Sequence, residues 1–217
     1  KRAIAFRSVA GPGNQMPQLA DYVRSVLVAG GIPAADIAVT PMDDTAYLVA
    51  RWRGSDPKAK PLVISGHLDV VEARPSDWQR DPFTPVVENG YLYGRGATDM
   101  KLDAAIATAA LLKMKRDGYR PRRDIVLAFS GDEETRMKTS AAIAEQLKNA
   151  ELVLNIDGGG GRYAEDGKPQ FFTWNGAEKT YADFELAVTN PGGHSSAPRP
   201  DNAIVQLSRA VERIGAY

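Results

Sequence analysis

Three short apolar segments, each followed directly by histidine or acidic residues, constrain the fold of this chain more than any other feature. They are residues 61–65, 124–130 and 151–156. Short, continuous apolar runs of this kind are typical of strands buried in a parallel sheet. Helical patterns rich in small and aliphatic residues lie between them, at 100–116 and 139–149. The alternation predicts an α/β fold, a three-layer sandwich around a mainly parallel sheet.

The first part of the chain carries three more predicted elements. Apolar residues at helical spacing predict a helix at 15–29, and an apolar run that ends in a polar turn predicts a strand at 46–53. The dipeptide Asn89-Gly90, flanked by Val86-Val87 and Tyr91-Leu92-Tyr93, favours a tight hairpin.

The alternation of strand and helix patterns ends after Gly161. We expect strands at 170–174 and 181–188, and a helix at 201–214 that is capped by Asp201. A boundary near 176–180 follows, with one domain at residues 1–178 and the beginning of a second at 179–217.

Composition excludes several classes of protein. Lys plus Arg and Asp plus Glu both number 27, so the net charge is zero and nothing favours a nucleic-acid or anionic-membrane partner. No apolar run approaches the roughly 20 residues that span a bilayer. The lack of cysteine excludes disulfides, thiolate zinc sites and a cysteine nucleophile. It leaves the compartment open between the cytoplasm and, if a leader has been removed, the periplasm or exterior.

The acidic and imidazole groups follow the apolar segments in a way that predicts one site. His67 and Asp69 follow the first segment, Glu133-Glu134 the second and Asp157 the third. Ligands of open α/β sheets bind beyond the carboxyl ends of the strands. Asp99 adds a carboxylate at the beginning of the predicted helix at 100–116.

One imidazole with several carboxylates suits a divalent cation, or two cations if one carboxylate bridges them. The spacing His67-x-Asp69 lets a nearby carboxylate orient the imidazole. Each residue alone also has a structural interpretation. His67 could be an ordinary histidine after a strand, and Glu133-Glu134 an acidic pair at a helix N-terminus. Asp99 could cap a helix, and Asp157 could be a turn residue. Their combination at successive strand ends favours the metal site.

Two other patterns do not predict a site. Residues 158–161 are glycines without the Lys-Ser/Thr of a phosphate-binding loop. Ser195 and Ser196 adjoin His194, but a serine next to its histidine in sequence is rarely a working nucleophile pair.

His67 and His194 are the only histidines, which excludes a mononuclear site of three or four histidines.

Five segments of this chain resemble the dinuclear-zinc metallopeptidase and amidohydrolase family numbered twenty, which includes carboxypeptidase S, glutamate carboxypeptidase and aminoacylase. The segments are 65–71, 93–101, 131–134, 155–159 and 192–198. The resemblance implies a zinc-exopeptidase-like catalytic domain at 1–178 and, at 179–217, the beginning of an α+β lid that forms homodimers.

The resemblance also implies a role for each site residue. His67 and Asp157 bind one zinc ion, Glu134 binds the other, and Asp99 bridges them; cobalt or manganese could substitute. Asp69 steadies His67, and Glu133 is the general acid/base. His194 would act from the lid, in the active site of a partner subunit. A cis peptide bond follows the bridging aspartate, between Asp99 and Met100.

The family takes a further histidine ligand that has no counterpart here, so we expect the chain to be a fragment of a longer enzyme. The implied reaction is hydrolysis of an amide bond in small peptides or N-acyl amino acids by a metal-activated water. Aspartate at position 157 leans towards carboxypeptidase S, aminoacylase and dipeptidase relatives. The alternative is a non-catalytic metal- or peptide-binding protein with the same fold, although Glu133 is not needed merely to hold metal.

Overall fold

The computed structural model describes residues 1–158, 160–177, 179–194, 196–197 and 199–217. By its contacts the chain divides into two compact units, Lys1–Trp174 and Asn175–Tyr217. Glu178, where we predicted the first domain to end, lies outside the described residues.

The first unit is an α/β sandwich around a five-stranded sheet of order β1-β2-β6-β3-β7. The strands are β1 (Ile37–Met42), β2 (Thr45–Trp52), β3 (Leu62–His67), β6 (Ile125–Ser130) and β7 (Leu152–Asn155). The helices are α1 (Met16–Ala29), α2 (Lys101–Arg116) and α3 (Lys138–Gln146), with short 3-10 turns η1 (Ala34–Asp36) and η2 (Pro75–Asp77). The predicted α/β class is confirmed.

The sheet is mixed. Strand β3 pairs in parallel with β6 and β7, whereas β2 pairs antiparallel with both β1 and β6. Strand β1 is not among the elements predicted from the sequence. The parallel part contains the three predicted apolar strands, so their carboxyl ends meet at one edge.

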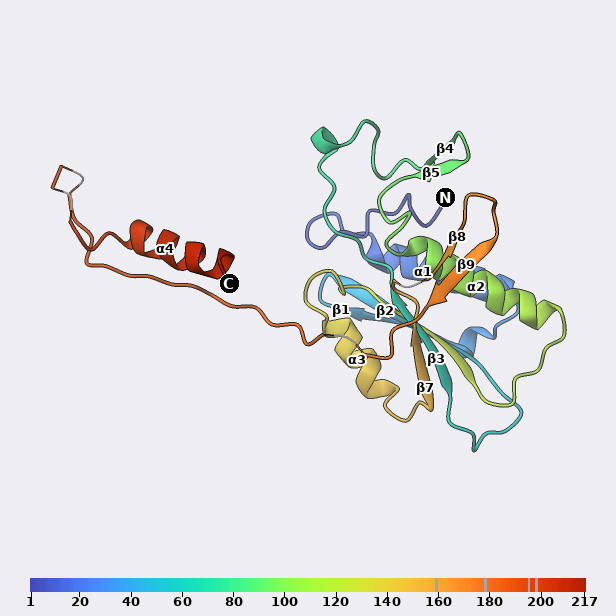
Figure 1. Cartoon of the computed structure of the whole chain (residues 1–217). Helices are drawn as coiled ribbons and strands as arrows, with labels where there is room; N and C mark the ends of the chain where they lie inside the picture. Colours follow the sequence, from blue (N-terminus) through green and yellow to red (C-terminus); the bar gives the residue numbers. More distant parts are fainter. Residues whose placement is uncertain (159, 178, 195, 198) are drawn as a thin grey trace. The chain divides into compact units, whose positions relative to one another are not determined.

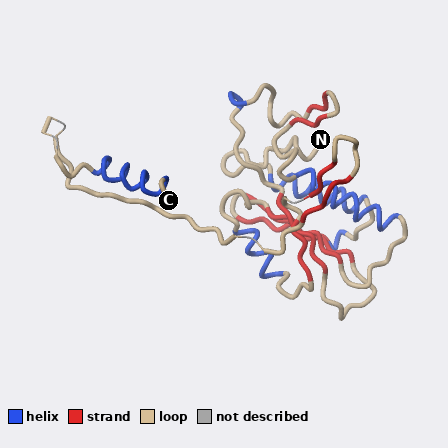
Figure 2. Tube along the Cα trace, in the orientation of Figure 1, coloured by secondary structure: helices blue, strands red, loops and turns tan. Residues whose placement is uncertain are grey.

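Two apolar clusters show that helices cover both faces of the sheet, with α1 and α2 on one side and α3 on the other (Figures 1 and 2). The first cluster joins α1 and α2 to the sheet through Leu19, Leu27, Leu111, Leu48, Leu127 and Phe129. The second joins α3 to the sheet through Ile143, Leu147, Val49, Val63, Val126 and Ala128. Successive residues of β6 therefore alternate between two cores, which explains why its sequence is apolar throughout.

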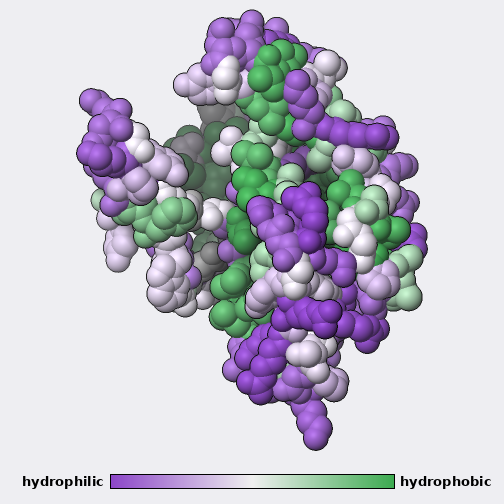
Figure 3. Space-filling model, turned by 90° about the vertical axis from the view of Figure 1, so that its right-hand side faces the viewer, coloured by the Kyte–Doolittle hydropathy of each residue, from purple (hydrophilic) through white to green (hydrophobic). Residues whose placement is uncertain are grey.

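Strand β7 corrects one prediction. We predicted a third buried strand, but all four of its residues are exposed, with Val153 at 54%. It lies at the edge of the sheet, and β3 is the one strand that pairs with it among the described residues. An apolar pattern predicts a strand but does not show whether other chain segments cover it. Figure 3 shows such apolar surface, in green, exposed among polar side chains.

Two hairpins complete the first unit. Strands β4 (Val86–Glu88) and β5 (Tyr91–Tyr93) form the predicted hairpin, in which Asn89 and Gly90 both have positive φ, as a type I′ turn requires. Strands β8 (Gly160–Tyr163) and β9 (Pro169–Thr173) form the second. Strand β9 matches the prediction at 170–174, whereas β8 was not predicted.

The second unit, Asn175–Tyr217, contains α4 (Ala203–Gly215). The prediction that Asp201 caps this helix is wrong: Asn202 accepts hydrogen bonds from the amides of Ile204 and Val205 through its side chain, while Asp201 pairs with Arg199. The strand predicted at 181–188 is also wrong, because no strand is assigned in the described part of this unit. An alternating pattern needs a hydrogen-bonded neighbour to become a strand. Among the described residues, no helix combines the length and apolar character needed to cross a membrane.

Candidate metal centre

His67 is the last residue of β3, and its imidazole is 1% exposed. Its Nδ1 lies 3.0 Å from the carbonyl oxygen of Asp69 and 3.5 Å from the carboxylate of the same residue. Donation from Nδ1–H to this carbonyl leaves the Nε2 lone pair free to bind a metal. The structure thus places Asp69 beside His67, but the atom that accepts the hydrogen bond is its carbonyl oxygen and not the predicted carboxylate.

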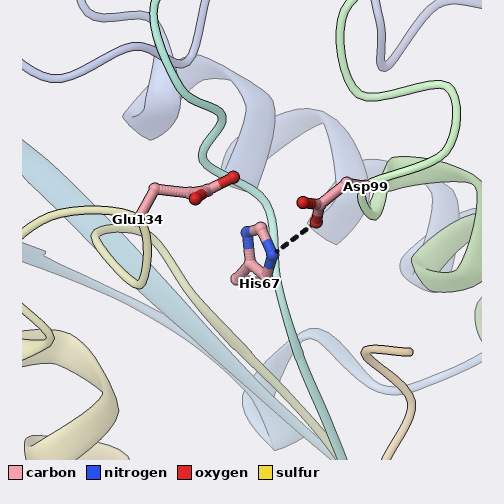
Figure 4. Close-up of side chains that lie close together, drawn as sticks. All are labelled: His67, Asp99 and Glu134. Atoms are coloured by element: carbon pink, nitrogen blue, oxygen red, sulfur yellow. Dashed lines mark hydrogen bonds and ion pairs between the residues drawn. The ribbon is translucent and has the colours of Figure 1, made fainter. Parts of the chain in front are cut away.

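Asp99 reaches His67 because the chain before α2 packs directly on β3. Gly66 has no side chain, and a Cβ at this position would lie 2.4 Å from Cε of Met100. Met100 is buried there, and the carboxylate of Asp99 lies 3.0 Å from His67 Nε2 (Figure 4). The cis peptide Asp99–Met100 that the resemblance implies is present. Asp99 does not cap α2, whose N-cap is Met100.

Glu133 and Glu134 lie in the loop between β6 and α3. The carboxylate of Glu133 is 3.8 Å from His67 Nε2, and Glu134 points towards the same imidazole (Figure 4). The backbone amide of Glu134 donates to the carboxylate of Asp69, at 3.0 Å. Since α3 begins only at Lys138 and has no acidic residue in its first turn, the glutamate pair does not serve its N-terminus.

Asp157 follows the exposed strand β7. Its carboxylate lies 3.5 Å from His67 Nε2, and its backbone amide donates to the side chain of Asn155. Gly159, two residues after Asp157, lies outside the described residues. The Nε2 atom of His67 therefore faces carboxylates from three separate chain segments.

These side chains form two overlapping groups of possible ligands. His67, Asp99 and Glu134 make one group, and His67, Glu133 and Asp157 the other; within each, one ligand atom per residue lies within 4.8 Å of the others. Imidazole and carboxylate donors suit zinc and other divalent cations. The donor set therefore fits a metal centre, and the second group also brings Glu133 within reach of an ion.

The pKa values of the acidic pair show the cost of gathering these charges. Burial raises the pKa of Glu133 and of Glu134, and neighbouring carboxylates raise both further, against an opposing effect of His67. Burial lowers the pKa of His67, but Asp69, Asp157 and Glu133 raise it more, to about 9. A cation would relieve the same repulsion that these shifts record.

Two buried residues beside the centre were not predicted from the sequence. Lys101 is 2% exposed, and its ammonium donates to the carbonyl oxygen of Phe6 at 2.9 Å. Burial lowers its pKa to about 8, against the opposing effect of Asp69. Asp132 is also 2% exposed and accepts hydrogen bonds from the beginning of α3. Both lie inside the motifs that carry the resemblance, but spacing alone does not show that they are buried.

His194 is the one predicted site residue that does not belong to the first unit. It belongs to the second unit, is exposed, and its Nδ1 lies 2.7 Å from the hydroxyl of Ser196. Ser195 lies outside the described residues.

Comparison with known proteins identifies relatives of this chain. The model of "Peptidase family M20/M25/M40" matches residues 63–211. The chain is 33% identical over 171 residues to "Carboxypeptidase S" of Saccharomyces cerevisiae, covering 74% of this chain and 30% of that protein. It is 34% identical over 171 residues to "N-fatty-acyl-amino acid synthase/hydrolase PM20D1" of Mus musculus, covering 75% of this chain and 33% of that protein. The chain thus spans about a third of the length of these curated relatives.

A solved structure shows the same fold. It is the M20 family metallo-carboxypeptidase Sso-CP2 from Sulfolobus solfataricus, with a TM-score of 0.61 and 23% sequence identity. The match covers 77% of this chain and 38% of the other.

Proposed function

Because this chain belongs to peptidase family M20/M25/M40, we propose that it provides the metal centre of a metallohydrolase that cleaves an amide bond in a small peptide or an N-acyl amino acid. The observation that carries this proposal is the convergence of Asp99, Glu133, Glu134 and Asp157 on the imidazole of His67. The names of the two relatives, a carboxypeptidase and an N-acyl amino acid hydrolase, support both substrate classes.

We assign the centre two zinc ions, for which cobalt or manganese could substitute. His67 and Asp157 would hold one ion, Glu134 would hold the other, and Asp99 would be the ligand that both ions share. The family resemblance supports this assignment, as does the position of Asp99 and Glu134 in one ligand group and of Asp157 in the other. When bound, zinc would lower the pKa of a coordinated water to about 7 and polarise a substrate carbonyl.

Glu133 is the general acid/base in this proposal. Its carboxylate accepts a proton from the attacking water and passes it to the departing nitrogen. Burial raises the pKa of Glu133, which moves it towards the neutral range in which a group both accepts and returns a proton. The carbonyl oxygen of Asp69 accepts a hydrogen bond from Nδ1 of His67, and the Asp69 carboxylate lies close by, so that Nε2 faces the centre.

His194 is assigned to stabilisation of the oxyanion that develops on the substrate carbonyl. An imidazole N–H that is held in place for this purpose contributes about 2.7–4 kcal/mol. Its exposure in a Gly/Pro/Ser loop of the second unit suits a residue that acts outside its own unit. We propose that it acts in the active site of a partner subunit, in a homodimer formed through the lid that begins at residue 179.

The test is amide hydrolysis by the full-length protein, assayed on dipeptides and on N-acyl amino acids with zinc present and after chelation. We expect turnover that depends on metal. Glu133→Gln should keep the metal and lose roughly 10²-fold or more in kcat, whereas the matched variant Glu134→Gln should weaken metal binding.

A metal-loaded protein that hydrolyses neither class would favour a non-catalytic binding protein and overturn the proposal. Full activity of Glu133→Gln would overturn the assignment of that residue.

A further inference from the structure

We propose that Asp132 is a positioning residue, whose buried carboxylate holds Glu133 and Glu134 at the metal centre. The inference rests on the proposed function, because it concerns how the general acid/base and a metal ligand are kept in place. Asp132 belongs to neither of the two ligand groups around His67. It acts through the loop between β6 and α3.

The carboxylate of Asp132 organises the far end of this loop. One oxygen accepts a hydrogen bond from the amide of Lys138 at 3.0 Å. The other accepts from the amide of Thr139 at 2.9 Å and also from the Thr139 hydroxyl. Since the side chain is 2% exposed, water cannot replace these bonds. The bonds fix the beginning of α3 relative to the end of β6.

Thr139 closes the loop from the other side. Its hydroxyl donates to Asp132 and accepts from the amide of Gly131, at 3.0 Å. Gly131 is itself packed against β2, where an added Cβ would lie 2.1 Å from the carbonyl oxygen of Ala46. The two ends of the loop are thus joined to each other and to the sheet, with Thr139 fully buried.

The backbone of Asp132 adds a second restraint. Its carbonyl oxygen accepts from the amide of Met137 at 2.8 Å and from the amide of Thr135 at 3.2 Å. Met137 takes a positive φ of 53°, an uncommon conformation for a residue with a side chain. The chain therefore turns back tightly on Asp132, and the two glutamates project from the turn.

These hydrogen bonds of Asp132 matter because charge repulsion opposes the placement of Glu133 and Glu134 at the centre. The two ligand groups bring Glu133 close to Asp157 and Glu134 close to Asp99, and carboxylates this close repel one another. The amide of Glu134 is also held by the carboxylate of Asp69. A loosened loop would let both side chains turn towards water, away from His67.

The same loop contains a matched control. Arg136 pairs with Asp43 and Asp44, but all three side chains are substantially exposed. Exposed ion pairs contribute little, so Arg136→Gln should leave kcat and metal affinity unchanged. Asp132→Asn keeps the shape of the buried side chain, yet its amide group must face a backbone N–H or the Thr139 hydroxyl.

The experiment compares Asp132→Asn with Arg136→Gln in the full-length protein, well below the unfolding temperature. We measure kcat and KM per bound metal, and we titrate the metal-free protein with zinc by calorimetry. For Asp132→Asn we expect kcat, or the affinity for one ion, to fall by about 10–100-fold with KM little changed. Thr139→Val should act in the same direction, and Thr139→Ser, which keeps the hydroxyl, should stay close to wild type.

A purely structural role gives a different result. Asp132→Asn would then lower the melting temperature while the folded fraction kept wild-type kcat and zinc affinity, which would overturn the proposal. If Asp132→Asn does not fold, the comparison of Thr139→Val with Thr139→Ser decides by the same measurements. Failure of the proposed function is separate, because it would appear as a metal-loaded wild-type protein that hydrolyses neither dipeptides nor N-acyl amino acids.

Discussion

The two units of this chain differ in whether their side chains are packed. In Lys1–Trp174, apolar clusters cover both faces of the sheet and hold His67 at 1% exposure among carboxylates from three strand ends. In Asn175–Tyr217, none of the described residues is buried, and His194 lies on an exposed loop. The first unit thus buries a histidine, His67, in the candidate metal centre, whereas the histidine of the second unit, His194, is exposed.

This difference shows that an apolar pattern in the sequence does not by itself mean that the side chains are buried in a core. Helix α4 carries exposed aliphatic side chains, among them Ile204 at 76% and Ile214 at 61%. Helix α1 has a comparable pattern, but its Leu19 and Leu27 are fully buried against the sheet. The predictions below test how far stability and chemistry follow this contrast.

The largest expected effect concerns the core of the first unit. Phe129→Ala removes a fully buried ring from β6 and should lower the free energy of unfolding by about 3–5 kcal/mol. Phe184→Ala, at a position 90% exposed in the second unit, should change it by less than about 0.5 kcal/mol. Urea unfolding of the full-length protein measures both. Equal losses would show that Phe184 is buried in the full-length protein and would remove the contrast.

The second prediction concerns His194 acting across a dimer. Full-length His194→Ala and Glu133→Gln, each of which we expect to be inactive alone, are mixed under conditions that exchange subunits. Hybrid dimers contain one intact composite site, so part of the activity should return. If mass spectrometry shows exchange and no activity returns, His194 does not act in a partner's site.

A third, smaller effect follows from the raised pKa of His67. Its pKa of about 9 in the metal-free protein means that the imidazole is protonated at pH 7.5, whereas a metal needs it neutral. The raised pKa stabilises the metal-free fold fully below the unfolded value of 6.5, and this contribution is lost as the pH rises through about 9.

Zinc binding at pH 7.5 should therefore release about one proton from His67. Calorimetry in buffers of different ionisation enthalpy measures it, with His67→Asn as the control that should lack this proton. Identical binding heats for the wild type in all buffers would contradict the prediction.

The smallest expected effect tests the cap of α4. Asn202→Ala should destabilise the helix by about 1 kcal/mol, because its side chain accepts from two backbone amides. Asp201→Ala should cost less, since the side chain of Asp201 forms an exposed ion pair with Arg199. Hydrogen exchange of the α4 amides compares the two variants, and a larger effect at Asp201 would restore the cap that the sequence suggested.

Local patterns were sufficient to predict the elements that carry the site. The apolar runs of β3 and β6, the Asn89-Gly90 hairpin and helix α2 all form as predicted, because each is determined by its own residues or by burial on both faces. The position of Glu134 near His67 followed from the carboxyl ends of parallel strands meeting at one edge, and that of Asp99 from its place at the beginning of the predicted helix at 100–116.

What could not be predicted depends on partners distant in the sequence. The exposure of β7, the missing strand at 181–188 and the choice of Asn202 over Asp201 as cap depend on which groups are at hand to pair. The role of Asp132 was hidden for the same reason: its burial and its bonds to Thr139 appear only when α3 packs against β6.

The central claim is that His67, and not His194, anchors the metal centre. It is tested most directly by zinc titration of the full-length protein, comparing wild type with His67→Asn and His194→Asn. We expect His67→Asn to weaken zinc binding by more than about 10²-fold, and His194→Asn to bind zinc as the wild type does. Wild-type zinc affinity in His67→Asn, or loss of zinc binding in His194→Asn, would contradict the account.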